Sequence, residues 1–136
     1  MSIPLANATI ILVEDDPNAQ LVAQDLLRMG GANRCYSRRN VDSAIAFAEK
    51  MPRVDLFLVD INMPHKSGFD LLDEVRQHER LQGALVVAVT AGTIEHDTAR
   101  IREFGFDGFI SKPLRAAEFA NQVQRILNGE RVWEMR

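Results

Sequence analysis

Residues 10–17 read IILVEDDP, four aliphatic residues followed by three acids and a proline. The aliphatic run is typical of a strand that is covered on both faces in a parallel sheet. Asp16 can cap the next helix, and Pro17 suits the first helical position, where a missing N–H costs nothing. This stretch therefore predicts a strand that ends at Glu14 and Asp15 and leads directly into a helix.

The alternation of strand and helix continues along the whole chain. We expect strands near residues 9–14, 33–36, 54–60, 84–90 and 107–111. The helices are expected from Pro17 to the glycines at 30 and 31, over 41–49, after Ser67, over 93–104 and over 115–127. Strands separated by helical patterns of this length are typical of a parallel sheet with crossover helices. The sequence therefore predicts a single α/β domain.

Length and composition exclude several classes of protein. The 136 residues fit one compact domain, and a net charge of -3 does not provide the broad basic face that nucleic-acid binding needs. No run approaches the roughly 20 apolar residues of a membrane helix, and the N-terminus lacks the features of a signal peptide. We therefore expect a cytoplasmic protein that binds neither nucleic acid nor membranes.

Polar residues occupy the C-terminal ends of four of the predicted strands. Glu14 and Asp15 come after the first strand, Asp60 after the third, Thr90 after the fourth and Lys112 after the fifth. These ends converge on one crevice in an open parallel sheet. Carboxylates are ligands that Mg²⁺ prefers, and a carboxylate such as Asp60 can accept a phosphoryl group when nearby cations offset the charge. The pattern therefore predicts a magnesium and phosphoryl-transfer site.

Four segments resemble the receiver domain of response regulators in two-component signalling. They read IILVEDDP at residues 10–17, DINMPHKSG at 60–68, VTA at 89–91 and GFISKP at 108–113. The resemblance covers roughly residues 7–128, so we expect a receiver domain over 1–128 and a short C-terminal tail over 129–136. It implies a doubly wound, flavodoxin-like sheet of five parallel strands in the order 2-1-3-4-5.

The resemblance also implies roles for the polar residues. Asp60 would be the phosphoacceptor, and Thr90 and Lys112 would each contact the bound phosphoryl group. The ligands of Mg²⁺, or of Mn²⁺ in its place, would all be oxygen atoms: the side chains of Glu14, Asp15 and Asp60 and the backbone carbonyl of Asn62. Glu14 would act largely through water.

Three further features are expected, the first two from the same resemblance and the third from the loop residues themselves. Thr90 and Phe109 would form a conformational switch, in which the aromatic ring turns inward after phosphorylation. The peptide bond between Lys112 and Pro113 would be cis, although only about 5% of X–Pro bonds are. Gly68 would allow a bend in the loop after Asp60 that is open only to a residue without a side chain.

Together these features predict a stand-alone response regulator. It would accept a phosphoryl group from a phosphohistidine of a histidine kinase or phosphotransfer protein, and signal through the face formed by helix 4, strand 5 and helix 5. It would not be an enzyme beyond its own phosphorylation and dephosphorylation. We expect a monomer or a weak, phosphorylation-dependent dimer, and the sequence does not specify the downstream protein target.

Two other classes share parts of this pattern. A phosphohydrolase of the haloacid-dehalogenase type needs a second carboxylate two positions after the nucleophile, and here that position holds Asn62, which cannot act as a general acid or base. A degenerate receiver that only binds partners would not need the phosphorylation residues. All five side chains are present: Glu14, Asp15, Asp60, Thr90 and Lys112.

Overall fold

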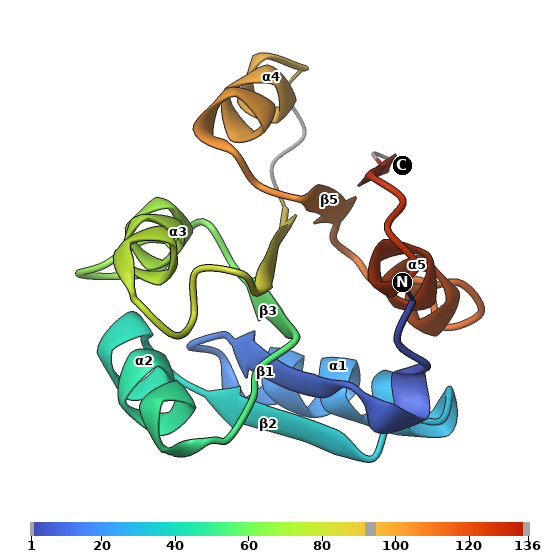
Figure 1. Cartoon of the computed structure of the whole chain (residues 1–136). Helices are drawn as coiled ribbons and strands as arrows, with labels where there is room; N and C mark the ends of the chain where they lie inside the picture. Colours follow the sequence, from blue (N-terminus) through green and yellow to red (C-terminus); the bar gives the residue numbers. More distant parts are fainter. Residues whose placement is uncertain (1, 92–94, 135–136) are drawn as a thin grey trace.

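Strands and helices alternate through the described residues, 2–91 and 95–134, of the computed structural model (Figure 1). The strands are β1 (Thr9–Val13), β2 (Arg34–Arg38), β3 (Leu56–Val59), β4 (Leu85–Thr90), β5 (Gly108–Ser111) and β6 (Val132–Glu134). The helices are α1 (Pro17–Met29), α2 (Val41–Lys50), α3 (Gly68–Gln77), α4 (Glu95–Phe104) and α5 (Phe119–Leu127), and a 3-10 turn, η1 (Leu5–Asn7), precedes β1. Among the described residues, no helix is long and apolar enough to cross a membrane.

The strands form one sheet in the order β2-β1-β3-β4-β5-β6, and every neighbouring pair is parallel. The predicted α/β fold and the order 2-1-3-4-5 are confirmed. The sheet has one strand more than the predicted five, because residues 132–134 of the expected tail pair with β5. The last strand is short, and it forms the edge of the sheet next to β5.

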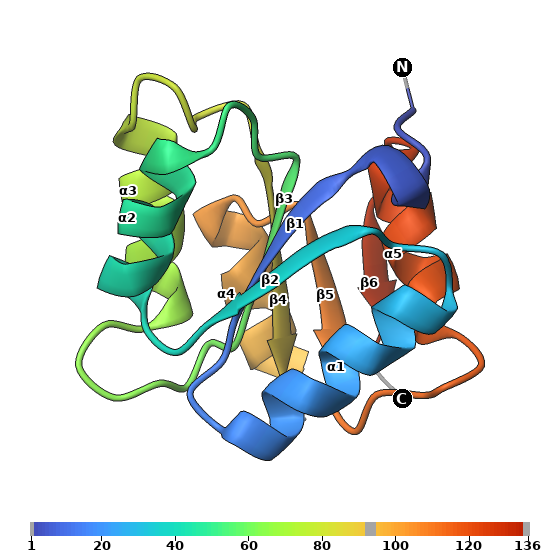
Figure 2. The ribbon, with the colours of Figure 1, turned by 90° about the horizontal axis from the view of Figure 1, so that it is seen from below.

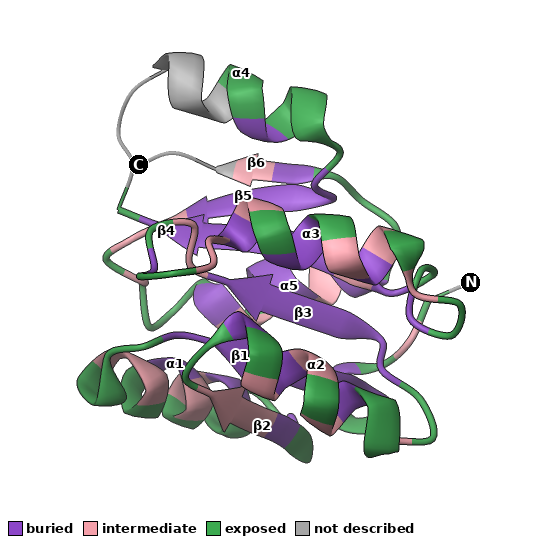
Figure 3. Cartoon of the chain, turned by 90° about the vertical axis from the view of Figure 1, so that its left-hand side faces the viewer, coloured by how far each residue is buried: buried purple, intermediate pink, exposed green. Residues whose placement is uncertain are grey.

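Helices cover both faces of the sheet. One core packs β-strand side chains against α1 and α5, through residues such as Leu27 and Phe119. The other core lies against α2, α3 and α4, through residues such as Ala44, Leu71 and Ile101. Figure 2 shows α2 and α3 on one side of the sheet and α5 on the other. Because both faces are covered, β1 and β3 are buried along their whole length, as the aliphatic runs predicted (Figure 3).

The helix starts largely agree with the predicted caps. The Asp16 carboxylate accepts a hydrogen bond from the Asn18 N–H at 3.1 Å and caps α1. Ser67 and Asp70 form a capping box at the start of α3. The expected start of α4 at residue 93 lies outside the described residues. α5 begins at Phe119 rather than near residue 115, after a turn over 115–118.

The described side chains of α4, at residues 99–104, make few buried contacts. Among its residues 99–104, only Ile101 is buried. Phe104 is 53% exposed, and its ring centroid lies 4.5 Å from that of Phe69 on α3. The Arg100 guanidinium lies 4.5 Å from the centre of the Phe69 ring. Aromatic and cation–π contacts with α3 therefore add to a single buried aliphatic side chain in holding this part of α4.

Two buried aspartates connect strands at their N-terminal ends, on the opposite side of the sheet from the predicted site. Asp55 precedes β3 and accepts a hydrogen bond from the Thr9 N–H at 2.8 Å. Asp107 precedes β5 and accepts one from the Val86 N–H at 2.9 Å. The Asp107 carboxylate also pairs with two arginines, at 2.7 and 2.9 Å: Arg76 of α3 and Arg131 just before β6. Asp107 therefore joins β4, β5, α3 and the start of β6.

Candidate functional site

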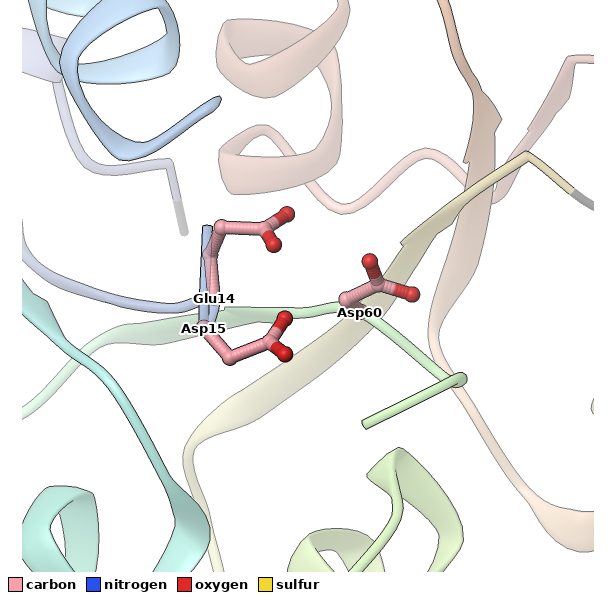
Figure 4. A group of neighbouring side chains, drawn as sticks. All are labelled: Glu14, Asp15 and Asp60. Carbon is pink, nitrogen blue, oxygen red and sulfur yellow. The ribbon is translucent and has the colours of Figure 1, made fainter. Parts of the chain in front are cut away.

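Three carboxylates meet at the C-terminal edge of the sheet. Glu14 and Asp15 come after β1 and Asp60 after the adjacent β3, and one oxygen atom of each lies within 4.8 Å of the others. Figure 4 shows the side chains of Glu14 and Asp15 extending toward Asp60. The backbone hydrogen bond from the Asp60 N–H to the Val13 carbonyl, at 3.1 Å, continues the sheet to the base of the cluster. The parallel pairing of β1 and β3 therefore places these acids side by side, as the sequence predicts.

Lys112, from the end of β5, contributes a cation to the same cluster. Its Nζ lies 2.5 Å from Glu14 Oε1 and 2.9 Å from Asp60 Oδ2. Its backbone N–H donates to the Thr90 carbonyl at 2.9 Å, and the bond to Pro113 is cis, as the resemblance implies. One ammonium group thus bridges carboxylates from two strands.

Neighbouring groups orient the acidic side chains. The Asn62 N–H donates to Asp60 Oδ1 at 2.9 Å, and the Asp16 N–H donates to Glu14 Oε2 at 3.1 Å. The Gln20 side chain on α1 donates to the Glu14 carbonyl at 2.5 Å, a contact that was not predicted from the sequence. Gln20 lies on the first helical turn, four residues after the Asp16 cap. This spacing is the sequence signal that could have predicted its contact with the end of β1.

Thr90 and Phe109 both lie inside the protein. Thr90 is 2% exposed, and its Oγ1 accepts a hydrogen bond from Asn62 Nδ2 at 3.3 Å. This places the Asn62 side chain in the site, in addition to the backbone carbonyl that was expected to matter. Phe109 is 1% exposed and belongs to the core beneath α2, α3 and α4. In this structure its ring points inward.

The loop after Asp60 differs from expectation in where its unusual backbone lies. His65, not Gly68, has a positive φ of 69°. Gly68 is needed for space instead, because a Cβ atom there would lie 3.1 Å from the Asp60 carbonyl oxygen and 3.0 Å from the Ile61 side chain. The prediction of a glycine-specific bend at Gly68 was therefore wrong, and close packing of α3 against the end of β3 is the reason for this glycine.

The charge of the cluster suits a divalent cation. Three carboxylates face one ammonium group, so negative charge is in excess. Burial raises the pKa of the Glu14 carboxyl, and the hydrogen bond from Lys112 offsets only part of this rise. Burial lowers the pKa of Lys112, but its bonds to Glu14 and Asp60 outweigh this and the net pKa is raised, so the side chain stays charged. The cluster offers oxygen donors only, which are those that Mg²⁺ prefers.

A largely apolar cavity of about 450 Å³ opens beside the charged cluster. Glu14, Asp60 and Lys112 line its polar end. The rest of its wall comes from α1, from the segment after β5 and from the ends of β1 and β4, and includes Val13, Val22, Val89 and Leu114. Sequence reasoning did not indicate this cavity, because residues from several separate elements form it. It leaves room for a group to approach Asp60 from the side of α1.

Known proteins resemble this chain along most of its length. Residues 10–124 match the family model of the response regulator receiver domain. The polar-differentiation response regulator DivK of Brucella ovis is 29% identical over 119 residues, which cover 88% of this chain and 95% of that protein. The receiver domain of a signal transduction histidine kinase from Syntrophus aciditrophicus has a TM-score of 0.78 and 30% identity, with 90% and 91% of the two chains covered. Vibrio cholerae CheY4, a chemotaxis response regulator, has a TM-score of 0.79 at 23% identity, covering 88% of this chain and 98% of that one, and supports the fold.

Proposed function

The chain belongs to the response regulator receiver family of two-component signalling, and from this we propose that it accepts a phosphoryl group on Asp60 from a phosphohistidine. Receiver domains take this group from histidine kinases or phosphotransfer proteins, and they are phosphoacceptors rather than classical enzymes. The observation that carries the proposal is the position of Asp60, within 4.8 Å of two further carboxylates and 2.9 Å from the Lys112 ammonium.

The transfer needs a nucleophile and a counter-charge. An Asp60 carboxylate oxygen attacks the phosphorus of the donor, a P–O bond forms, and the P–N bond to the imidazole breaks, with the electron pair returning to the ring nitrogen. The Lys112 ammonium is already within hydrogen-bonding distance of Asp60, so it offsets negative charge where the phosphoryl group arrives. Thr90 Oγ1 accepts from Asn62, which leaves the Thr90 hydroxyl proton available for a phosphoryl oxygen.

The acidic cluster fits the divalent cation that receivers use. Glu14, Asp15 and Asp60 would hold Mg²⁺ or Mn²⁺ together with the Asn62 carbonyl. When bound, the cation would neutralise charge that develops on the phosphoryl oxygens. Glu14 is 4% exposed, whereas Asp15 is exposed and Asp60 is half-buried, so Asp15 and Asp60 are the more accessible ligands.

Removal of the cation tests this proposal directly. Acetyl phosphate is a small donor that needs no docking surface. With Mg²⁺ present, we expect intact-mass measurement to show one added phosphoryl group per chain. After chelation by EDTA the added mass should be absent, because the three carboxylates would repel the incoming anion. Equal labelling with and without Mg²⁺ would show that the acidic cluster is not a metal site.

Signalling would then depend on Thr90, Phe109 and α4. The hydroxyl of Thr90 moves toward the phosphoryl group and leaves space behind it, so that Phe109 repacks. Phe109 is the register partner of Ala88, and it lies in the core on the face of the sheet that α4 covers. A phosphoryl group adds about -1.5 to -2 charges, which is enough to bias a two-state element. The output face of α4, β5 and α5 would carry this change to a protein partner or to a second copy of the chain in a weak dimer.

The role of Lys112 can be separated from acceptance of the phosphoryl group. The Lys112→Ala variant should still be labelled by acetyl phosphate and Mg²⁺, but α4 amide resonances should shift less than about one third as far as in the wild type. The reason is that the ammonium would no longer link the phosphoryl group to the end of β5. NMR spectra before and after labelling measure this.

The control for this experiment is another paired lysine. Lys66 contacts Asp42 and Glu74 at 2.7 and 2.8 Å on the surface, away from the cluster. Lys66→Ala should keep the full α4 shift. If Lys112→Ala also keeps it, Lys112 does not transmit the switch.

A further inference from the structure

The sixth strand, β6, is an integral part of the sheet. β6 runs parallel to β5 with Gly108 opposite Val132 and Phe109 opposite Trp133, and Figure 3 shows it between β5 and α4. Val132 is 1% exposed. A Cβ atom at Gly108 would lie only 2.9 Å from the Val132 carbonyl oxygen, so the glycine in β5 is what allows this close approach.

Ion pairs fix the start of β6. The Arg131 guanidinium lies 2.9 Å from Asp107 Oδ1, which joins the residue before β6 to the residue before β5. The Glu130 carboxylate lies 3.0 Å from Arg125 Nε of α5. These contacts hold residues 130–132 against the body of the domain. Trp133, the next residue of the strand, makes different contacts.

Trp133 connects the core around Phe109 with α4. Trp133 packs against the core cluster that contains Phe109, and the two residues are register partners on adjacent strands, which lie about 4.8 Å apart. The Arg102 guanidinium of α4 lies 4.7 Å from the centre of a Trp133 ring. Phe109 is 1% exposed with Trp133 beside it. Trp133 is therefore the aromatic residue on the edge strand that faces α4.

We propose that Trp133 and Arg102 form a clasp between β6 and α4 that phosphorylation of Asp60 opens. The proposal rests on the proposed function. Any movement of Phe109 changes the packing of its neighbour Trp133, and any movement of α4 displaces Arg102 from the ring. Among the described side chains of α4, at residues 99–104, only Ile101 is buried, so the two movements together release Trp133 toward solvent.

Because of thermodynamic linkage, the clasp can be measured both through its own opening and through the affinity of the Asp60 site. If occupancy of the Asp60 site opens the clasp, then a variant without the clasp must favour occupancy. A cation–π contact at an exposed site is weak, so its removal should tighten binding of a phosphoryl analogue about twofold to fivefold. Beryllofluoride, which mimics a phosphoryl group on a carboxylate, is the probe.

Trp133 is the single tryptophan of the chain, so its emission reports the clasp without a label. Titration of the wild type with beryllofluoride in Mg²⁺ should shift the emission to longer wavelength and saturate. Asp60→Asn should show no shift. Arg102→Ala should start with emission already shifted and bind beryllofluoride about twofold to fivefold more tightly.

The matched control is Arg100→Ala, which removes an arginine of the same helix that lies over Phe69 instead of Trp133. It should leave the starting emission as in the wild type, and any gain in affinity through a looser α4 should appear without that emission shift. Equal effects of Arg100→Ala and Arg102→Ala would overturn the clasp, since loosening of α4 alone would then explain them. Phosphoryl uptake is followed in parallel by intact mass. Uptake without a change in Trp133 emission would overturn the clasp and leave the proposed function standing, whereas no uptake would overturn both.

Discussion

Acetyl phosphate and Mg²⁺ should add one phosphoryl group to the wild-type chain and none to the Asp60→Asn variant. Asparagine has nearly the same shape as aspartate, but its amide lacks the ionised oxygen that attacks phosphorus. The Asp60 carboxylate accepts hydrogen bonds from the Asn62 N–H and from Lys112, and the amide oxygen can keep one of them. The variant should therefore fold, and the loss of labelling measured by intact mass should be complete.

The neighbouring acid Asp16 provides the control. Its carboxylate caps α1, and asparagine caps helices equally well. Asp16→Asn should therefore take up the phosphoryl group as the wild type does. Labelling of Asp60→Asn at the wild-type level would refute the assignment of the phosphoacceptor, and loss of labelling in Asp16→Asn would show that the acid assigned to capping also takes part in the chemistry.

A second large effect is expected on stability, at Asp107. Asp107→Ala should lower the free energy of unfolding by about 2–4 kcal/mol. The substitution leaves the buried Val86 N–H without its acceptor and removes the partner of Arg76, whose side chain is 34% exposed. Both losses affect β4 and β5, which border the site. Urea unfolding followed by circular dichroism measures the change.

Two milder variants show which contact matters. Asp107→Asn keeps an oxygen acceptor for the Val86 N–H and should lose about half as much stability. Arg131→Ala removes only a pair with a 57% exposed side chain, so it should cost less than about 1 kcal/mol. A loss below about 0.5 kcal/mol in Asp107→Ala would contradict a structural role for this carboxylate.

The site was predictable from the sequence because long aliphatic runs mark the strands, and the residue directly after each run lies at the end of its strand. The runs before Glu14, Asp60 and Lys112 are buried strands that pair in parallel, so their C-terminal residues had to meet. The contacts of Lys112 with both Glu14 and Asp60 result from that convergence. Caps at Asp16 and Ser67 were predictable because they depend on neighbouring residues alone.

Features that depend on distant contacts could not be predicted in the same way. β6 has three residues, too few for a periodic pattern, and its pairing depends on the space left by Gly108. An isolated glycine within a strand indicates close approach of another backbone, and this was the available signal for β6. The buried contacts of Asp55 and Asp107 were missed because an acid before a strand is also typical of a turn.

The weak attachment of α4 has a consequence for the resting protein. Moving Ile101 out of its buried place costs about 1.5–3 kcal/mol, and each cation–π contact adds about 0.5–1 kcal/mol. A gap of about 2–4 kcal/mol leaves a minor conformer populated at between roughly 0.1 and 3%. The chain would thus visit an arrangement in which α4 has moved, without phosphorylation of Asp60.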